Sequence, residues 1–124
     1  MNAGFSTLMV YVNDMARSTT FYRAVLDAAP QMESPYWTQF ELGSGVMLAL
    51  HPARDGQTRP APGWTPGFSV ADLHAARAKL LAAGGTVAMD YHDVPGGVIL
   101  EIADPDGNVL DLSQMGITAA ELAK

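Results

Sequence analysis

Short apolar runs recur in the same order in the two halves of the chain. Residues 8–14 (LMVYVND) and residues 66–72 (PGFSVAD) both resemble strands that end in Val-x-Asp. The two motifs begin at position 12 and position 70, an offset of 58 residues. A repeat at a fixed offset indicates two copies of one structural unit.

Each strand-like run is followed by apolar residues with helical spacing. The first set is Met15, Phe21, Tyr22, Val25 and Leu26, and the second is Leu73, Ala76, Leu80, Leu81 and Ala83. Asp14 and Asp72 suit helix N-caps, because a side-chain oxygen there accepts from a free backbone N–H. Pro30 is expected to stop the first helix, and Gly84-Gly85 the second, since glycine adopts positive φ readily.

Further strand-like runs follow each helix, and turn residues separate them. The runs are residues 36–42, 46–51, 86–91, 98–103 and 109–113. Residues 104–108 (DPDGN) have the composition of a hairpin turn. The pattern predicts an α+β fold of two tandem βαβββ modules, which form curved mixed sheets around a cavity with the helices outside.

The module boundaries follow from the same pattern. We place module one at about 4–51 and module two at about 65–114 of a single 124-residue domain. The proline-rich segment of about 52–64 is predicted to be the linker between them. The tail, residues 115–124, is expected to form a last helical turn or a flap.

Composition excludes several classes of protein. The chain is 48% hydrophobic, which is enough to bury a core. The net charge is −6 and the seven Lys and Arg residues are scattered, which argues against nucleic acid as a partner. There is no cysteine, so disulfides and thiolate metal sites are excluded. The sequence has no membrane-length apolar run and no recognisable signal peptide, so a cytoplasmic location without membrane partners is expected.

Three segments together carry a family resemblance: VYVNDMARSTTFYRAVL, GFSVADLHAARAKLLAAGG and IADPDGNVLDL. They resemble the vicinal oxygen chelate superfamily, which includes glyoxalase I, extradiol dioxygenases, and fosfomycin- and bleomycin-resistance proteins. The opening segment looks nearest to metal-free antibiotic-binding resistance proteins. The resemblance implies paired βαβββ modules, a homodimer, and a cavity made by two modules within one chain or across two chains.

The resemblance also implies where a metal would bind. Metal-using members carry ligands on the first and last strand of each module, and the matching positions here are Thr7, Ala49, Thr65 and Asp111. Of these four side chains, Asp111 is the one that binds divalent cations strongly. We therefore predict no metal or other cofactor at these positions. A binding protein is favoured over an enzyme.

Strand alternation selects the side chains that would line the cavity. Branched aliphatic residues occupy one face of each strand and would pack against the helices. The other face carries the candidate ligand-binding residues Thr7, Met9, Tyr11, Trp37, Met47, Ala49, His51 and Thr65, and Trp64 lies in the linker at the cavity mouth. The simpler interpretation of the two tryptophans is core packing. The simpler interpretation of His51 is a position on the surface.

Two carboxylates, Glu101 and Asp111, complete the candidate set. If residues 104–108 form the hairpin turn, positions 101 and 111 oppose each other on the cavity face. Like charges opposed in this way are destabilising unless a cation lies between them. A ligand amine or guanidinium is favoured, with His51, Arg54, Arg59 or a metal as alternatives. A one-residue slip in register would turn one acid away, and Glu101 could instead lie at a solvated rim.

Three hypotheses follow from these residues. The first is a protein that sequesters an antibiotic or a similar planar or basic small molecule. The second is a divergent metal-dependent lyase, isomerase or dioxygenase that uses a shifted ligand set such as His51, Glu101 and Asp111. The third is a structural or regulatory dimer with a vestigial cavity. His74 is expected to have no chemically relevant neighbour, and Arg77 to lie on ordinary solvated surface.

Overall fold

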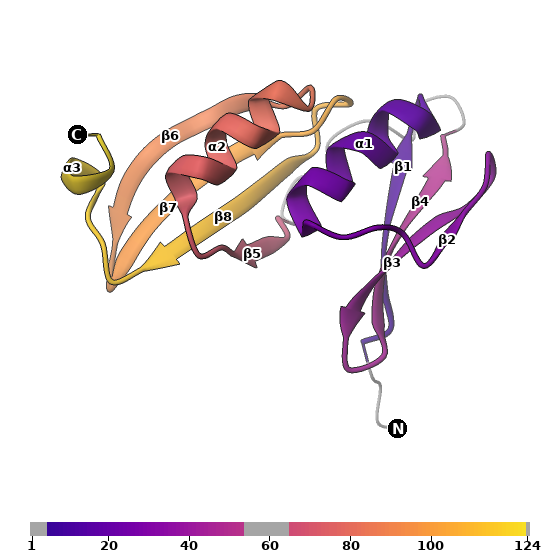
Figure 1. Ribbon diagram of the computed structural model, residues 1–124, viewed down its shortest axis with the longest axis horizontal. Helices are drawn as coiled ribbons and strands as arrows, with labels where there is room; N and C mark the ends of the chain where they lie inside the picture. Colours follow the sequence, from indigo (N-terminus) through magenta and orange to yellow (C-terminus); the bar gives the residue numbers. More distant parts are fainter. Residues whose placement is uncertain (1–4, 54–64, 124) are drawn as a thin grey trace. The chain divides into compact units, whose positions relative to one another are not determined.

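The computed structural model describes residues 5–53 and 65–123 of the protein. The chain divides into two compact units, Met1–Thr58 and Arg59–Lys124, here called module one and module two. Each module has one four-stranded mixed sheet and a helix packed along it (Figure 1). The predicted α+β class is confirmed.

Module one contains β1 (Thr7–Val12), α1 (Met15–Leu26), β2 (Met32–Glu33), β3 (Thr38–Gly43) and β4 (Val46–Pro52). The strand order is β1-β4-β3-β2, with β1 parallel to β4 and the other pairs antiparallel. Strand β2 was not predicted, because two residues are too few to show any alternation. Trp37, predicted to lie within a strand, directly precedes β3.

Module two contains β5 (Gly67–Ser69), α2 (Leu73–Ala82), β6 (Thr86–Val94), β7 (Gly97–Ala103), β8 (Val109–Met115) and α3 (Ala119–Leu122). Its strand order, β5-β8-β7-β6, repeats the topology of module one. The tandem βαβββ arrangement is therefore confirmed, and the tail takes the helical alternative. Among the described residues, no helix is long and apolar enough to cross a membrane.

The helix ends lie where the sequence predicted them. The carboxylates of Asp14 and Asp72 each accept a backbone N–H at 3.0 Å, from Arg17 and from Ala75. Helix α1 ends at Leu26, and its C-cap Asp27 lies three residues before Pro30. Helix α2 ends just before Gly84, whose φ of 103° suits glycine and strains other residues.

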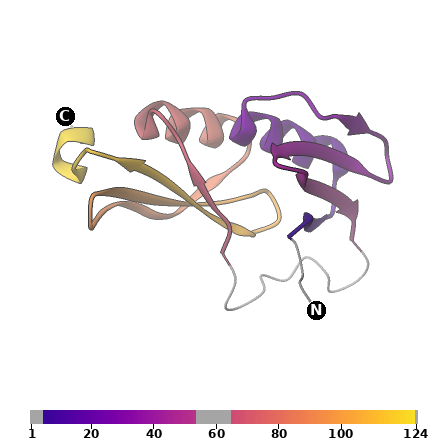
Figure 2. The ribbon, with the colours of Figure 1, turned by 90° about the horizontal axis from the view of Figure 1, so that it is seen from below.

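The core of each module lies between its helix and one face of its sheet. The fully buried apolar side chains include Phe21, Tyr22, Phe40, Leu48 and Leu50 in module one, and Leu73, Leu80, Leu100, Ile102, Leu110 and Leu112 in module two. Figure 2 shows α2 on one side of its sheet. Within residues 65–123, no helix covers the opposite side, which is called here the open face of module two. The corresponding side of the module-one sheet is called the open face of module one.

Candidate functional site

The hairpin between β7 and β8 is organised by one buried carboxylate. Asp104 is 3% exposed, and its Oδ1 accepts the backbone N–H groups of Asp106 and Asn108 at 2.9 Å each. Its Oδ2 accepts from Asn108 Nδ2 at 2.9 Å. The Asp104 N–H in turn donates to the Asn108 carbonyl at 2.7 Å. This turn fixes the register of β7 and β8, the two strands that it joins.

That register places Glu101 directly opposite Asp111, as the sequence predicted. Directly opposed residues in an antiparallel pair have Cβ atoms about 4.5–5.5 Å apart. Asp111 also pairs with Gly67 on β5, and Glu101 pairs with Met89 on β6. The four residues form a row across the open face of module two, with the two acids in its centre, and this row is called here the acid row.

Asp111 has an unmet hydrogen-bonding need. Its Oδ1 atom is buried and has no hydrogen-bond partner among the described residues. An ionised carboxylate can only accept hydrogen bonds, so this oxygen requires an N–H, an O–H or a cation. Gly67 beside it has no side chain, and a Cβ built there would be in ordinary van der Waals contact with the Asp111 Cβ, at 3.9 Å. The row is therefore suited to receive a donor group from a ligand.

The open face of module one carries aromatic side chains instead. His51 on β4 pairs with Tyr11 on β1, and their rings meet edge to face with centroids 5.7 Å apart. The Trp37 ring lies 6.3 Å from that of His51, also edge to face. Trp37 Nε1 donates to Gln39 Oε1 at 2.8 Å. Such a cluster presents both ring edges and polar atoms to a flat ligand.

The remaining predicted site residues lie in different environments. Met9 is 42% exposed, whereas Ala49 beside it is fully buried. Thr7 and Met47 are half-buried, and Thr65 is exposed just before β5. Trp64, Arg54 and Arg59 lie outside the described residues.

The shifted metal-ligand set is divided between the modules, with His51 in module one and both acids in module two. Across residues 5–53 and 65–123, no group of three or more His, Cys, Asp or Glu side chains is arranged to hold a metal ion. The resemblance-derived positions Thr7, Ala49 and Thr65 supply no strong ligand either. A metal at this site would therefore have Asp111 and Glu101 as its protein ligands within module two.

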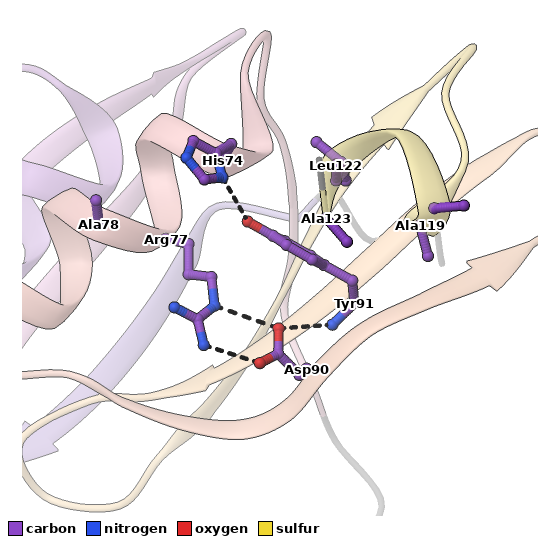
Figure 3. Close-up of a pocket in the computed structure, with 9 residues that line it drawn as sticks. His74, Arg77, Ala78, Asp90, Tyr91, Ala119, Leu122 and Ala123 are labelled. Atoms are coloured by element: carbon purple, nitrogen blue, oxygen red, sulfur yellow. Dashed lines mark hydrogen bonds and ion pairs between the residues drawn. The ribbon is translucent and has the colours of Figure 1, made fainter.

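A groove of about 630 Å³ lies on the helix side of module two, and its residues were not predicted (Figure 3). Arg77 on α2 donates to Asp90 on β6, from Nε at 3.2 Å and from Nη2 at 2.8 Å. The Tyr91 hydroxyl lies 3.4 Å from His74 Nδ1. Arg77 lies on solvated surface as expected, with its side chain 31% exposed, but its pairing with Asp90 was not predicted, nor was the contact between His74 and Tyr91.

The ion pair accounts for the electrostatics of this groove. The hydrogen bond from Arg77 lowers the pKa of Asp90, and the same bond raises the pKa of Arg77. Burial raises the pKa of Tyr91. Arg77 and Asp90 are paired with each other, so their ion pair connects α2 to β6. The groove therefore offers a ligand fewer unpaired polar groups than the row of Gly67, Asp111, Glu101 and Met89 does.

The comparisons with known proteins identify the family. The family model described as "Glyoxalase/Bleomycin resistance protein/Dioxygenase superfamily" matches residues 4–112. The chain belongs to this superfamily. No curated protein matches it.

Solved structures of the superfamily share the fold. A glyoxalase-related enzyme from Fulvimarina pelagi is 21% identical, with a TM-score of 0.79 over 91% of this chain and 88% of its own. A glyoxalase/bleomycin resistance protein from Albidiferax ferrireducens T118 is 25% identical, with a TM-score of 0.73 over 89% and 97%. A family enzyme from Burkholderia phytofirmans PsJN is 16% identical, with a TM-score of 0.74 over 91% and 99%. At these identities, the function of this superfamily member must be argued from its own residues.

Proposed function

We propose that this superfamily member binds and sequesters a small organic molecule that carries a cationic group, such as an antibiotic or a similar planar, basic compound. The observation that carries the proposal is the acid row of module two. Glu101 opposes Asp111, and the Oδ1 atom of Asp111 is buried without a partner among the described residues. A ligand ammonium or guanidinium would supply both the donor and the opposite charge.

Without a ligand, two features of this row would destabilise the described part of module two. Opposed like charges weaken a strand pair, and a buried oxygen without a donor loses the hydrogen bonds that water would give it. Such local destabilisation is common where a residue is kept for binding instead of for folding. A cationic ligand removes both effects at once.

In this proposal no metal takes part, because Thr7, Ala49 and Thr65 are poor ligands and Asp111 is left with one acidic neighbour. The ligand would bind at the open face of module two, and we expect the protein to be a homodimer. Protection of the cell would then be stoichiometric with the protein, since nothing is turned over.

Paired probes of similar ring outline test the proposal. Proflavine is cationic at neutral pH and acridine is largely neutral, so calorimetric titration of both separates charge from stacking. Asp111→Asn and Glu101→Gln should each weaken proflavine binding about tenfold, the value of one charge-assisted hydrogen bond. Acridine binding should change little. Glu33→Gln, on exposed β2, removes the same charge elsewhere and is the matched control.

Equal binding of proflavine by wild type and by the Asp111→Asn, Glu101→Gln double variant would contradict the proposal. Native mass spectrometry of protein purified without chelators, with metal analysis of the same sample, addresses the alternative. We expect a dimer without stoichiometric metal. One divalent ion per chain would favour a metal-dependent lyase, isomerase or dioxygenase.

A further inference from the structure

The ring of His51 in module one lies within hydrogen-bond distance of a backbone carbonyl. Its Nδ1 atom lies 2.8 Å from the backbone carbonyl oxygen of Pro52. A carbonyl oxygen has no hydrogen to give, so Nδ1 must carry the proton of this hydrogen bond. In the neutral ring, the lone pair is therefore on Nε2.

The neighbours of His51 are fixed as well. Tyr11 is its cross-strand partner, and the Trp37 ring stands at 82° to the imidazole. The indole N–H of Trp37 is already used by Gln39, whose amide nitrogen donates in turn to Gln31 Oε1 at 2.7 Å. This chain of hydrogen bonds orients Trp37 and commits its donor, so the indole does not supply a proton to His51.

We infer that His51 Nε2 is a hydrogen-bond acceptor for a hydroxyl or N–H group on an aromatic ring that packs against Tyr11 and Trp37. Within the described part of the chain, Nε2 has no hydrogen-bond partner, and the side chain is half-buried, so a ligand atom can reach it. The two rings beside it supply apolar contact for the body of that ligand.

This inference rests on the proposed function in one respect, which is that the open sheet faces bind small molecules. It concerns the open face of module one, which sets a second chemical requirement apart from that of the acids. The acids of module two select for positive charge, whereas His51 selects for a neutral donor on an aromatic ring. A phenol or an aromatic amine meets the second requirement, and the corresponding ether does not.

The test uses two naphthalene probes that differ in one donor. Protein with ¹⁵N-labelled histidine is titrated with 1-naphthol and with 1-methoxynaphthalene, and long-range ¹H–¹⁵N spectra follow both ring nitrogens. In the free protein we expect a protonated Nδ1 and an unprotonated Nε2 for His51. 1-Naphthol should bind roughly two- to tenfold more tightly than its ether, the range for one neutral hydrogen bond, and should shift Nε2.

Two variants assign the effect to the acceptor. His51→Phe keeps a ring between Tyr11 and Trp37 but removes Nε2, so the two probes should bind it equally. His92→Phe makes the same change on β6 and should leave the preference intact. An unprotonated Nδ1 in the free protein, or equal affinities of wild type for the two probes, or no binding of either, would overturn the inference.

The outcomes also separate the two proposals. If proflavine binding depends on the acids while 1-naphthol gains nothing over its ether, the inference about His51 fails and the proposed function stands. If 1-naphthol is preferred but the acid variants bind proflavine normally, the cationic ligand of the proposed function fails and the acceptor role of His51 stands.

Discussion

Corresponding rows of the two sheets carry different chemistry. In module one the row across the open face is Met9, Ala49, Gln39 and Met32, in the order of strands β1-β4-β3-β2. In module two, the row in the order β5-β8-β7-β6 is Gly67, Asp111, Glu101 and Met89. The backbone pairing is the same, and the two central positions change from neutral to acidic.

The residue beside the central pair also differs between the two rows, with Met9 in module one and Gly67 in module two. Ala49 is fully buried beside Met9, so its position offers no space for a charged group. Asp111 has Gly67 at the position of Met9, and a side chain is absent where Met9 has four heavy atoms. We therefore expect that the neighbours of Asp111, and not the shared topology alone, accommodate the acids of module two.

Transferring an acid to module one should give the largest effect. Ala49→Asp would bury a carboxylate with no opposite charge, and we expect a loss of about 3–5 kcal/mol in the free energy of unfolding, the range for an uncompensated buried charge. Urea denaturation at neutral pH, followed by amide signals of module one, measures it.

Changing Met9 together with Ala49 tests whether the neighbouring residue decides if an acid is tolerated. Met9→Gly recreates the Gly67 neighbour of Asp111, so a double-mutant cycle with Ala49→Asp should show a favourable coupling of about 0.5–3 kcal/mol. Additive losses would mean that the neighbouring residue is not what permits the acid.

Neutralising an acid in module two should have the opposite sign and a smaller size. Glu101→Gln removes the repulsion from Asp111, and we expect an increase of about 0.2–1 kcal/mol in the free energy of unfolding without ligand. Thermal and urea unfolding of wild type, Glu101→Gln and the surface control Glu33→Gln measure it. A loss of stability would mean that the pair is already bridged by a cation in the free protein.

The smallest effect is expected at the ion pair between Arg77 and Asp90. The two side chains are 31% and 56% exposed, so solvent and salt screen the pair, and its coupling should lie at the low end of about 0.2–1 kcal/mol. The folded-state pKa of Asp90 is lowered. The pair therefore stabilises the fold above the unfolded pKa of about 3.9, and this contribution is lost as pH falls below that value. Asp90→Asn should remove this part of the pH dependence.

The sequence predicted those features that short-range chemistry determines. The caps Asp14 and Asp72 lie where an aspartate precedes a helical pattern, and the DPDGN turn sets the pairing of Glu101 with Asp111. Once both ends of a hairpin turn are known, every opposed pair follows from counting, because strand residues alternate regularly.

The groove of Figure 3 could not be predicted in this way. The pairing of β6 with β7 shifts register twice, between Val87 and Met89 and between Met89 and His92. Each irregularity resets which side chains face α2, and nothing in the alternation of residues reveals where it occurs. For the same reason, the meeting of Arg77 with Asp90 was not foreseen. Helix spacing placed Arg77 on its helix, but the facing residue depends on those bulges.

The Asp104 turn has a consequence for how this protein can diversify. Hydrogen bonds between Asp104 and residues 106–108 hold the turn and involve neither position 101 nor position 111, so we expect these positions to stay opposed when their side chains change. Ligand preference can therefore change by substitution at two positions without a new backbone. A library randomised at 101 and 111, with 104–108 held constant, would sample many binding chemistries on one scaffold.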